Sequence, residues 1–168
     1  MRTRATSRDR LSFPALRRGS RASRRRITFP RVKLFSQDTK AQALARSPLF
    51  QGLSKKELIA LAKVTEDMEA PAGKVLCREG DLGHEFFVIV EGEVDIVKGG
   101  KRLRTEGPGE FFGEIALLEN VRRTATVTAR TPLRFFVLTR QSFSSLLHRQ
   151  PRIERKILVE LAKRVVDR

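Results

Sequence analysis

The chain of 168 residues contains no tryptophan, no tyrosine, one cysteine and two histidines. The lone Cys77 excludes an intramolecular disulfide, and its place in an apolar stretch predicts a buried structural thiol. His84 and His148 show no HxH or HxxxH spacing. We therefore expect no metal site, which disfavours a metal-dependent jelly-roll enzyme.

Long apolar segments are absent as well. No run approaches the ~20 apolar residues of a membrane span, and the N-terminus lacks the continuous apolar region of a secretory signal. There is no Walker-type phosphate loop, and no serine has a histidine base within a recognised hydrolase motif. We therefore expect a cytoplasmic protein that is not an enzyme and needs no cofactor.

Acidic residues are scarce, and the scarcity is greatest at the N-terminus. The whole chain has a formal net charge of +16. Residues 1–33 hold twelve basic residues and one acid, a net charge of +11, whereas residues 34–168 account for the remaining +5. The first segment shows no apolar period, so we predict a disordered basic tail over 1–33 and one folded domain over 34–168.

Several interpretations of this tail remain open. It could bind nucleic acid or an anionic membrane through its charge. Its Arg- and Ser-rich, acid-poor composition is also typical of an organelle transit peptide. Arg17-Arg18-Gly19-Ser20 has the form of a basophilic kinase site, and a wrongly assigned translation start would explain the tail equally well.

The middle of the chain alternates short apolar stretches with glycine and proline. The predicted strands are 65–70, 74–78, 86–91, 93–98, 101–105, 125–130 and 134–139. Many short strands at this spacing are typical of a sandwich or jelly roll, so we expect a mainly β fold with flanking helices.

Helices are predicted on both sides of the strands. Residues 38–45 suit a short helix, and Ser54-Lys55-Lys56-Glu57 forms a capping box for the next one. Leu53 and Leu58 are placed as a hydrophobic staple around this cap. Leu58, Leu61 and Ala62 then continue one apolar face.

Two more helices are predicted at the C-terminal end. Thr139 can cap a helix that runs to about residue 148, and Pro151 fits the first turn of another. The apolar residues of the last helix recur every four positions: Ile153, Ile157, Leu161 and Val165, with Leu158 and Ala162 beside them. This spacing predicts an amphipathic helix.

The run from Phe112 to Val127 is the stretch most informative about function. A helix beginning near Glu114 leaves backbone N–H groups without intrahelical partners, which favours an anion at its start. Arg123 can offer two hydrogen bonds to phosphate oxygens, whereas Glu114 can accept hydrogen bonds from a sugar hydroxyl. The run therefore suits a small phosphate ester of a sugar. The alternative is that Glu114 and Arg123 form an ordinary surface ion pair.

The same run resembles the phosphate-binding cassette of cyclic nucleotide-binding domains. The family pattern is Phe-Gly-Glu-(Leu/Ile)-Ala-Leu, a short variable stretch, then Pro-Arg-(Ala/Thr)-Ala-Thr-Val, and only Arg122 departs from it by replacing the proline. Residues 79–94 resemble the strand pair that precedes the cassette, with Gly80 and Gly83 in the turn. The resemblance covers about residues 47–166.

This resemblance implies an eight-stranded β-roll with N-terminal helices and C-terminal lid helices, which senses cAMP and possibly cGMP. It assigns the ribose 2′-OH to Glu114 and the phosphate to Arg123. The ligand-binding residues that it implies are Gly113, Glu114, Ile115, Ala116, Arg123, Thr124 and Ala125. The lid residues would be Ile153, Ile157 and Leu161, on a helix that often carries a dimer contact in the family.

Three further points follow from the resemblance. Thr124 permits cGMP without requiring it, so we expect both nucleotides to bind, with cAMP as the usual ligand. No output domain is visible, so the output would be a partner protein, the basic tail or a part lost from this chain. The expected protein partner is another protein or a second copy of this chain. Two alternatives stay open: a nucleic-acid-associated regulator that uses the tail, and a degenerate domain, signalled by Arg122, that binds nothing.

Overall fold

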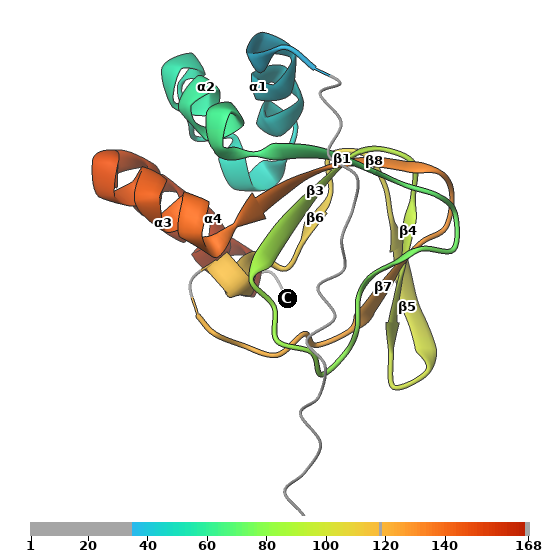
Figure 1. Ribbon diagram of the computed structural model, residues 1–168. Helices are drawn as coiled ribbons and strands as arrows, with labels where there is room; N and C mark the ends of the chain where they lie inside the picture. The colour runs from blue at the N-terminus through green and yellow to red at the C-terminus, as the bar shows by residue number, and fades with distance from the viewer. Residues whose placement is uncertain (1–34, 118, 167–168) are drawn as a thin grey trace, which may run out of the picture.

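The computed structural model describes residues 35–117 and 119–166. Within them, two four-stranded antiparallel sheets face each other and a group of helices covers the outer face of one sheet (Figure 1). The predicted tail, 1–33, and the side chain of Val165 lie outside the described part of the chain.

The two sheets have the strand orders β1-β8-β3-β6 and β2-β7-β4-β5. The first consists of β1 (Glu66–Ala70), β3 (Glu85–Glu91), β6 (Phe111–Phe112) and β8 (Leu133–Thr139). The second consists of β2 (Val75–Cys77), β4 (Val94–Lys98), β5 (Lys101–Glu106) and β7 (Thr126–Ala129). The predicted eight-stranded roll is confirmed. Each of the seven predicted ranges matches a strand to within one residue at either end, and β6 is the strand without a predicted range.

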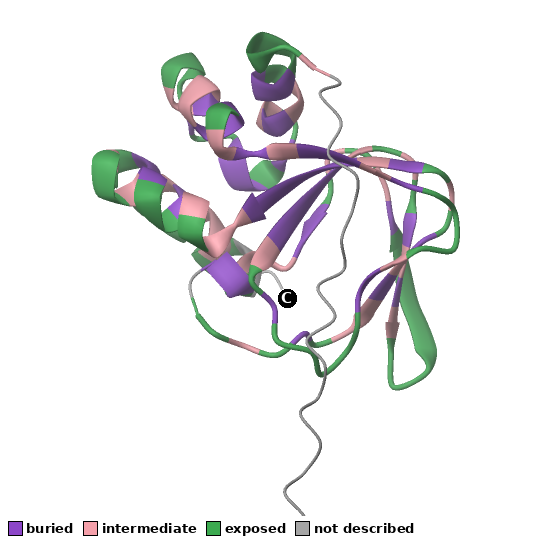
Figure 2. Ribbon diagram, viewed as in Figure 1, coloured by how far each residue is buried: buried purple, intermediate pink, exposed green. Residues whose placement is uncertain are grey.

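The first sheet is buried on both faces (Figure 2). Side chains alternate along β3, so Phe86 and Val88 enter a core shared with the helices. Phe87 and Ile89 enter a second core between the two sheets. A strand buried on both sides needs apolar residues at successive positions, which explains the apolar run in β3.

The four predicted α-helices begin within one residue of their predicted starts. They are α1 (Gln37–Ala45), η1 (Pro48–Phe50), α2 (Lys55–Val64), η2 (Glu114–Leu117), α3 (Arg140–Arg149) and α4 (Pro151–Val166). The capping box is formed, because Ser54 N donates to Glu57 Oε2 at 2.8 Å and Glu57 N donates to Ser54 Oγ at 3.3 Å. The hydroxyl of Thr139 caps α3 by accepting from Ser142 N at 3.2 Å.

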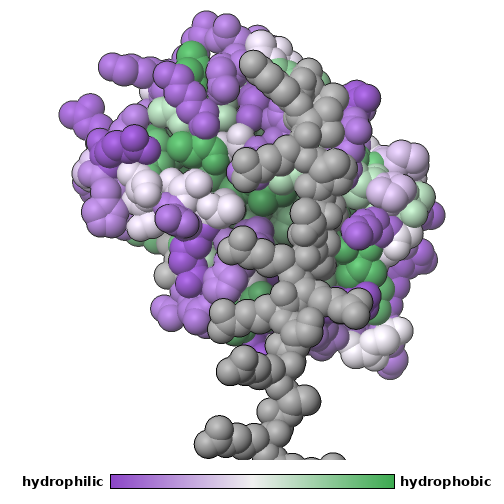
Figure 3. Space-filling model, in the orientation of Figure 1, coloured by the Kyte–Doolittle hydropathy of each residue, from purple (hydrophilic) through white to green (hydrophobic). Residues whose placement is uncertain are grey.

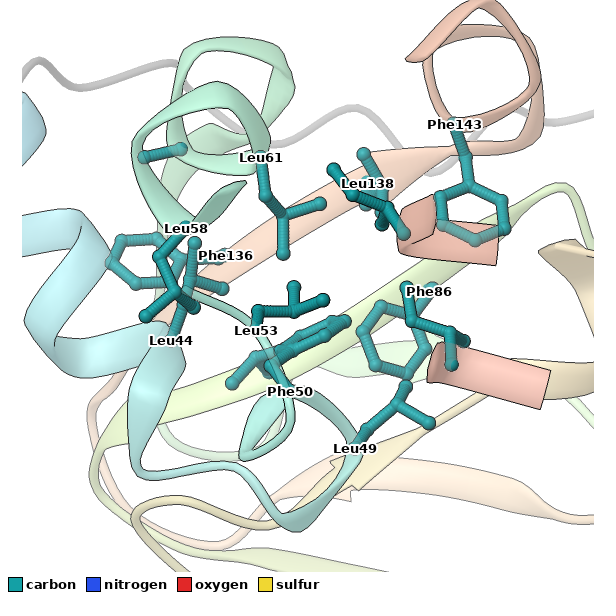
Figure 4. Close-up of a cluster of buried hydrophobic side chains, with 14 of the residues drawn as sticks. Leu44, Leu49, Phe50, Leu53, Leu58, Leu61, Phe86, Phe136, Leu138 and Phe143 are labelled. Atoms are coloured by element: carbon teal, nitrogen blue, oxygen red, sulfur yellow. The ribbon is translucent and has the colours of Figure 1, made fainter. Parts of the chain in front are cut away.

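The core under the helices joins distant parts of the chain (Figure 4). Leu53 and Leu58, the predicted staple, are both buried there. Ile153 and Ile157 of α4 are 0% and 1% exposed in the same core, whereas Leu158 is 43% exposed. The apolar face of α4 is therefore narrower than the sequence predicts.

Ion pairs tie the helices to one another and to the sheet. Lys156 Nζ of α4 lies 2.7 Å from Glu57 Oε2 of α2, and this hydrogen bond lowers the pKa of Glu57. Lys40 of α1 is buried, with its Nζ 2.7 Å from Asp67 Oδ1 and 2.6 Å from the Thr65 carbonyl oxygen. The same ammonium group lies 5.6 Å from the centre of the Phe136 ring.

Candidate ligand-binding site

Gly113 makes the sharp turn from β6 into the single 3-10 turn η2. Its φ is +79°, which favours glycine. A Cβ at this position would collide with Arg123 Nη1 and come within 2.8 Å of the Glu85 carbonyl oxygen. The turn brings the two ends of the predicted cassette together, because Gly113 and Arg123 are in direct contact.

The second half of the cassette pairs with the glycine-containing turn before β3. Arg123 N donates to the Asp81 carbonyl oxygen at 2.7 Å, and Gly83 N donates to the Val121 carbonyl oxygen at 3.2 Å. These two bonds form an isolated bridge between Leu82 and Arg122 that does not use the N–H group of Arg122. A residue without an N–H group, such as proline, would therefore lose no hydrogen bond of this bridge.

Arg122 adds a bond that a proline could not make. Its Nη1 donates to the Gly80 carbonyl oxygen at 2.7 Å, across the same pair of segments. The one departure from the family pattern therefore supports the cassette backbone in this structure.

Arg123 is the buried cation of the cassette, and it is 9% exposed. Its Nη2 donates to the Glu85 carbonyl oxygen at 2.8 Å and lies 3.2 Å from Glu85 Oε2, so the ion pair of Arg123 is with Glu85. Its guanidinium carbon lies 5.5 Å from the centre of the Phe87 ring. A Cβ on Gly83 would collide with the guanidinium.

One nitrogen of this guanidinium is not used. Arg123 Nη1 is buried and has no hydrogen-bond partner among the residues that the structure describes. A buried donor without a partner costs free energy, so such a group is normally satisfied by something else. Phosphate oxygens suit an arginine held in this way, because they accept short charge-assisted hydrogen bonds.

The remaining predicted site residues follow Gly113 or flank Arg123 along the chain. Glu114 is partly exposed and Ala116 is buried in η2, whereas Ile115 is 50% exposed. Thr124 is exposed, and Ala125 is partly buried against the core between the sheets. Of the predicted site residues, Gly113 is thus brought against Arg123 from a distant position, and Thr124 and Ala125 follow Arg123 directly in the chain.

Three residues that the sequence analysis does not assign to the site hold it in place. Glu85 and Gly83 enclose the Arg123 guanidinium, and the glycine turn was the available signal for them. Arg140, the first residue of α3, donates from Nε to the Ala116 carbonyl oxygen at 2.7 Å and from Nη2 to the Glu119 carbonyl oxygen at 2.6 Å. Nη2 also lies 3.2 Å from the Gly83 carbonyl oxygen.

The predicted lid residues belong to the helical core. Ile153 and Ile157 are fully buried in the helical core, where α4 packs against η1 and α3, and Leu161 is partly buried there. Contact between these isoleucines and a purine would require α4 to leave this core. The lid therefore stays a prediction.

Comparison with known proteins agrees with this geometry. The family model described as Cyclic nucleotide-binding domain matches residues 67–150. The chain belongs to the cyclic nucleotide-binding domain family. This match includes β3, the whole cassette and Arg140, so every contact of Arg123 described above lies within it.

Relatives of known function share this domain. A cGMP-dependent protein kinase of Eimeria tenella is 44% identical over 84 residues, which cover 50% of this chain and 8% of that protein. A cAMP-dependent protein kinase regulatory subunit of Schizosaccharomyces pombe is 33% identical over 129 residues, or 76% of this chain and 31% of that protein. The chain therefore spans less than a third of either relative.

Solved structures show the same fold. The regulatory domain of Toxoplasma gondii PKA, crystallised with cAMP, has a TM-score of 0.60 and 32% identity, and the match covers 66% of this chain and 44% of that chain. The fold of the chain is thus that of the cyclic nucleotide-binding domain family. In the described ranges, no helix is long and apolar enough to cross a membrane, and no group of three or more His, Cys, Asp or Glu side chains could hold a metal ion.

Proposed function

We propose that this domain senses cAMP, and cGMP as well, with Arg123 on the cyclic phosphate and Glu114 on the ribose 2′-OH. The observation that carries the proposal is the buried Nη1 of Arg123, which has no partner in the described part of the chain and lies where a Cβ on residue 113 would collide with it. A ligand phosphate would supply the acceptor that this donor lacks. The domain acts by binding and catalyses no reaction.

The bound state is relayed through protein contacts in the cytoplasm. A route begins at Arg140, which connects the cassette carbonyls to the first turn of α3. The partner is another protein or a second copy of this chain, and the exposed Leu158 and Val159 of α4 support a contact there. Binding of nucleic acid by the basic segment 1–33 stays a prediction from charge alone, testable by deleting that segment.

Calorimetric titration of the full chain with cAMP and with cGMP tests the ligand. Arg123→Ala should weaken binding by ~2–5 kcal/mol, which is the range for truncating one partner of a buried charge contact. This corresponds to ~30-fold to several thousand-fold in the dissociation constant. Arg123→Lys keeps the charge but loses the planar pair of donors, so its cAMP affinity should lie between those of the wild type and Arg123→Ala.

Arg102→Ala is the matched control. Arg102 lies on β5, and its side chain is 60% exposed. It should bind like the wild type, and thermal unfolding should show that all the variants are folded. If Arg123→Ala binds cAMP within about twofold of the wild type, Arg123 does not bind the phosphate.

A further inference from the structure

A groove lies between α2 and α3, on the helical side of the molecule. Its volume is about 680 Å³. Its apolar lining is Ile59, Ala60, Val64 and Leu146, and its polar lining is Lys55, Lys56, Lys63, Arg149 and Gln150. Figure 3 shows hydrophobic surface between the positions of these two helices, with hydrophilic side chains around it.

The charges around this groove all have one sign. The three lysines and the arginine that line it are exposed, and no acidic residue is among the lining residues. Glu57, the acid on α2, is held by Lys156 of α4. An apolar floor with a rim of cations is complementary to a partner that is apolar on one side and acidic beside it.

The charge also argues against occupants from this chain. The N-terminal segment 1–33 has a net charge of +11, so the cations of the groove would repel it. None of the helices α1, α2, α3 and α4 carries a net negative charge, which disfavours a second copy that docks through a helix. Nucleic acid would satisfy the cations but would leave the apolar floor without a partner.

We propose that the groove binds an acidic amphipathic helix of a partner protein. The apolar face of that helix would cover Ile59 and Leu146, while its Asp and Glu side chains would meet Lys56 and Lys63. The ten residues of α2 span ~15 Å, so two to three turns of a partner helix fit along it.

The groove is joined to the ligand site by α3. Arg140 at the start of this helix binds the cassette carbonyls, and Arg149 at its end lines the groove. A shift of the cassette that moves Arg140 would therefore move one wall of the groove. This coupling, unlike the groove itself, rests on the proposed function.

Fluorescence anisotropy with designed peptides tests the groove on the full chain. The probe is a labelled helical peptide of about 14 residues with a leucine stripe flanked by glutamates. Two control peptides replace all glutamates by lysine or all leucines by serine. The acidic amphipathic peptide should bind more tightly than both, and raising the salt from about 0.05 M to about 0.5 M should weaken it.

Charge reversal locates the binding. The double variant Lys56→Glu, Lys63→Glu should weaken the acidic peptide at least about tenfold. The matched variant Lys98→Glu, Lys101→Glu at the β4–β5 turn should bind it like the wild type. Equal binding of all three peptides, absence of binding, or an unchanged affinity of the Lys56, Lys63 variant would overturn the groove proposal.

Two further measurements separate the alternatives. Binding to phosphatidylglycerol vesicles is also measured. If the wild type binds the vesicles, the Lys56, Lys63 variant does not, and neither binds the peptide, the surface is a membrane-binding site and the proposal is overturned. Saturating cAMP should change the peptide affinity, and an unchanged affinity would overturn the coupling through α3. If calorimetry detects no cAMP binding while the peptide still binds the groove, the proposed function fails and the groove proposal stands.

Discussion

Each of the two cores contains one buried cation, and the two cations differ in how they are satisfied. Lys40 at the helical core is 6% exposed and Arg123 at the core between the sheets is 9% exposed. Both lie over a phenylalanine ring, at 5.6 Å and 5.5 Å from its centre. Lys40 contacts a carboxylate and a carbonyl, whereas Arg123 makes the same two kinds of contact through Nη2 alone and has its buried Nη1 without a partner among the described residues.

This difference teaches which property marks a ligand-binding cation. Burial, charge and an aromatic neighbour are the same at both sites. Burying a charge is unfavourable unless its hydrogen bonds are made, and an arginine has five N–H donors to satisfy. The unsatisfied Nη1 supports the proposal that Arg123 binds the ligand phosphate, whereas the contacts of Lys40 are made within the protein.

The largest expected effect is on stability, from Lys40→Met. This change leaves Asp67 buried without its cation, so the free energy of unfolding should fall by ~3–5 kcal/mol. Chemical denaturation measures the loss, and the cAMP affinity of the folded fraction should stay within about twofold. The double variant Lys40→Met, Asp67→Leu should recover much of the stability, because an apolar pair can replace a buried ion pair.

Arg123→Ala should show the reverse pattern, with a large loss of affinity and a smaller change in stability. If Lys40→Met lost as much cAMP affinity as Arg123→Ala, the distinction between a structural lysine and a ligand-binding arginine would be wrong.

Glu114→Gln separates the ribose contact from the phosphate contact. Hydrogen bonds to charged groups contribute ~1.5–3 kcal/mol, so the variant should lose about that much affinity for cAMP. A 2′-deoxy cyclic nucleotide should bind the wild type weakly and should lose little more in the variant. Additive losses in this cycle, measured by calorimetry, would exclude Glu114 from the ribose site.

Arg140→Ala tests the positioning of the cassette from α3. The variant loses the bonds to the Ala116 and Glu119 carbonyls, and we expect cAMP affinity to fall about tenfold, the scale of one or two net hydrogen bonds. Amide exchange in 114–123 should become faster without ligand. Arg149→Ala, at the other end of α3, serves as the control, and equal exchange in both variants would show that Arg140 does not hold the cassette.

Thr124→Ala has the smallest expected effect. Its hydroxyl is exposed beside Arg123 and can bond the exocyclic amino group of a syn guanine. The variant should therefore lose ~1 kcal/mol more affinity for cGMP than for cAMP, the scale of one net hydrogen bond. Equal losses for both nucleotides would place the Thr124 contact on the phosphate that they share.

Local features of this protein were predictable because each depends on residues close in sequence. The caps Ser54 and Thr139 act over three residues, and seven strands follow from apolar stretches between glycine and proline breakers. Gly113 and Arg123 belong to one contiguous cassette, so the resemblance of that stretch to the family pattern nominated both. β6 was missed because a strand of two residues is too short to show a period.

Contacts between distant segments decided the rest. Glu85 meets Arg123 across 38 residues, and Arg140 reaches carbonyls that lie 21 to 57 residues earlier in the chain. Such pairs form only when packing brings their strands and helices together, and no local pattern records them. The same packing buried Ile153 and Ile157 in the helical core and left one nitrogen of Arg123 without a partner among the described residues.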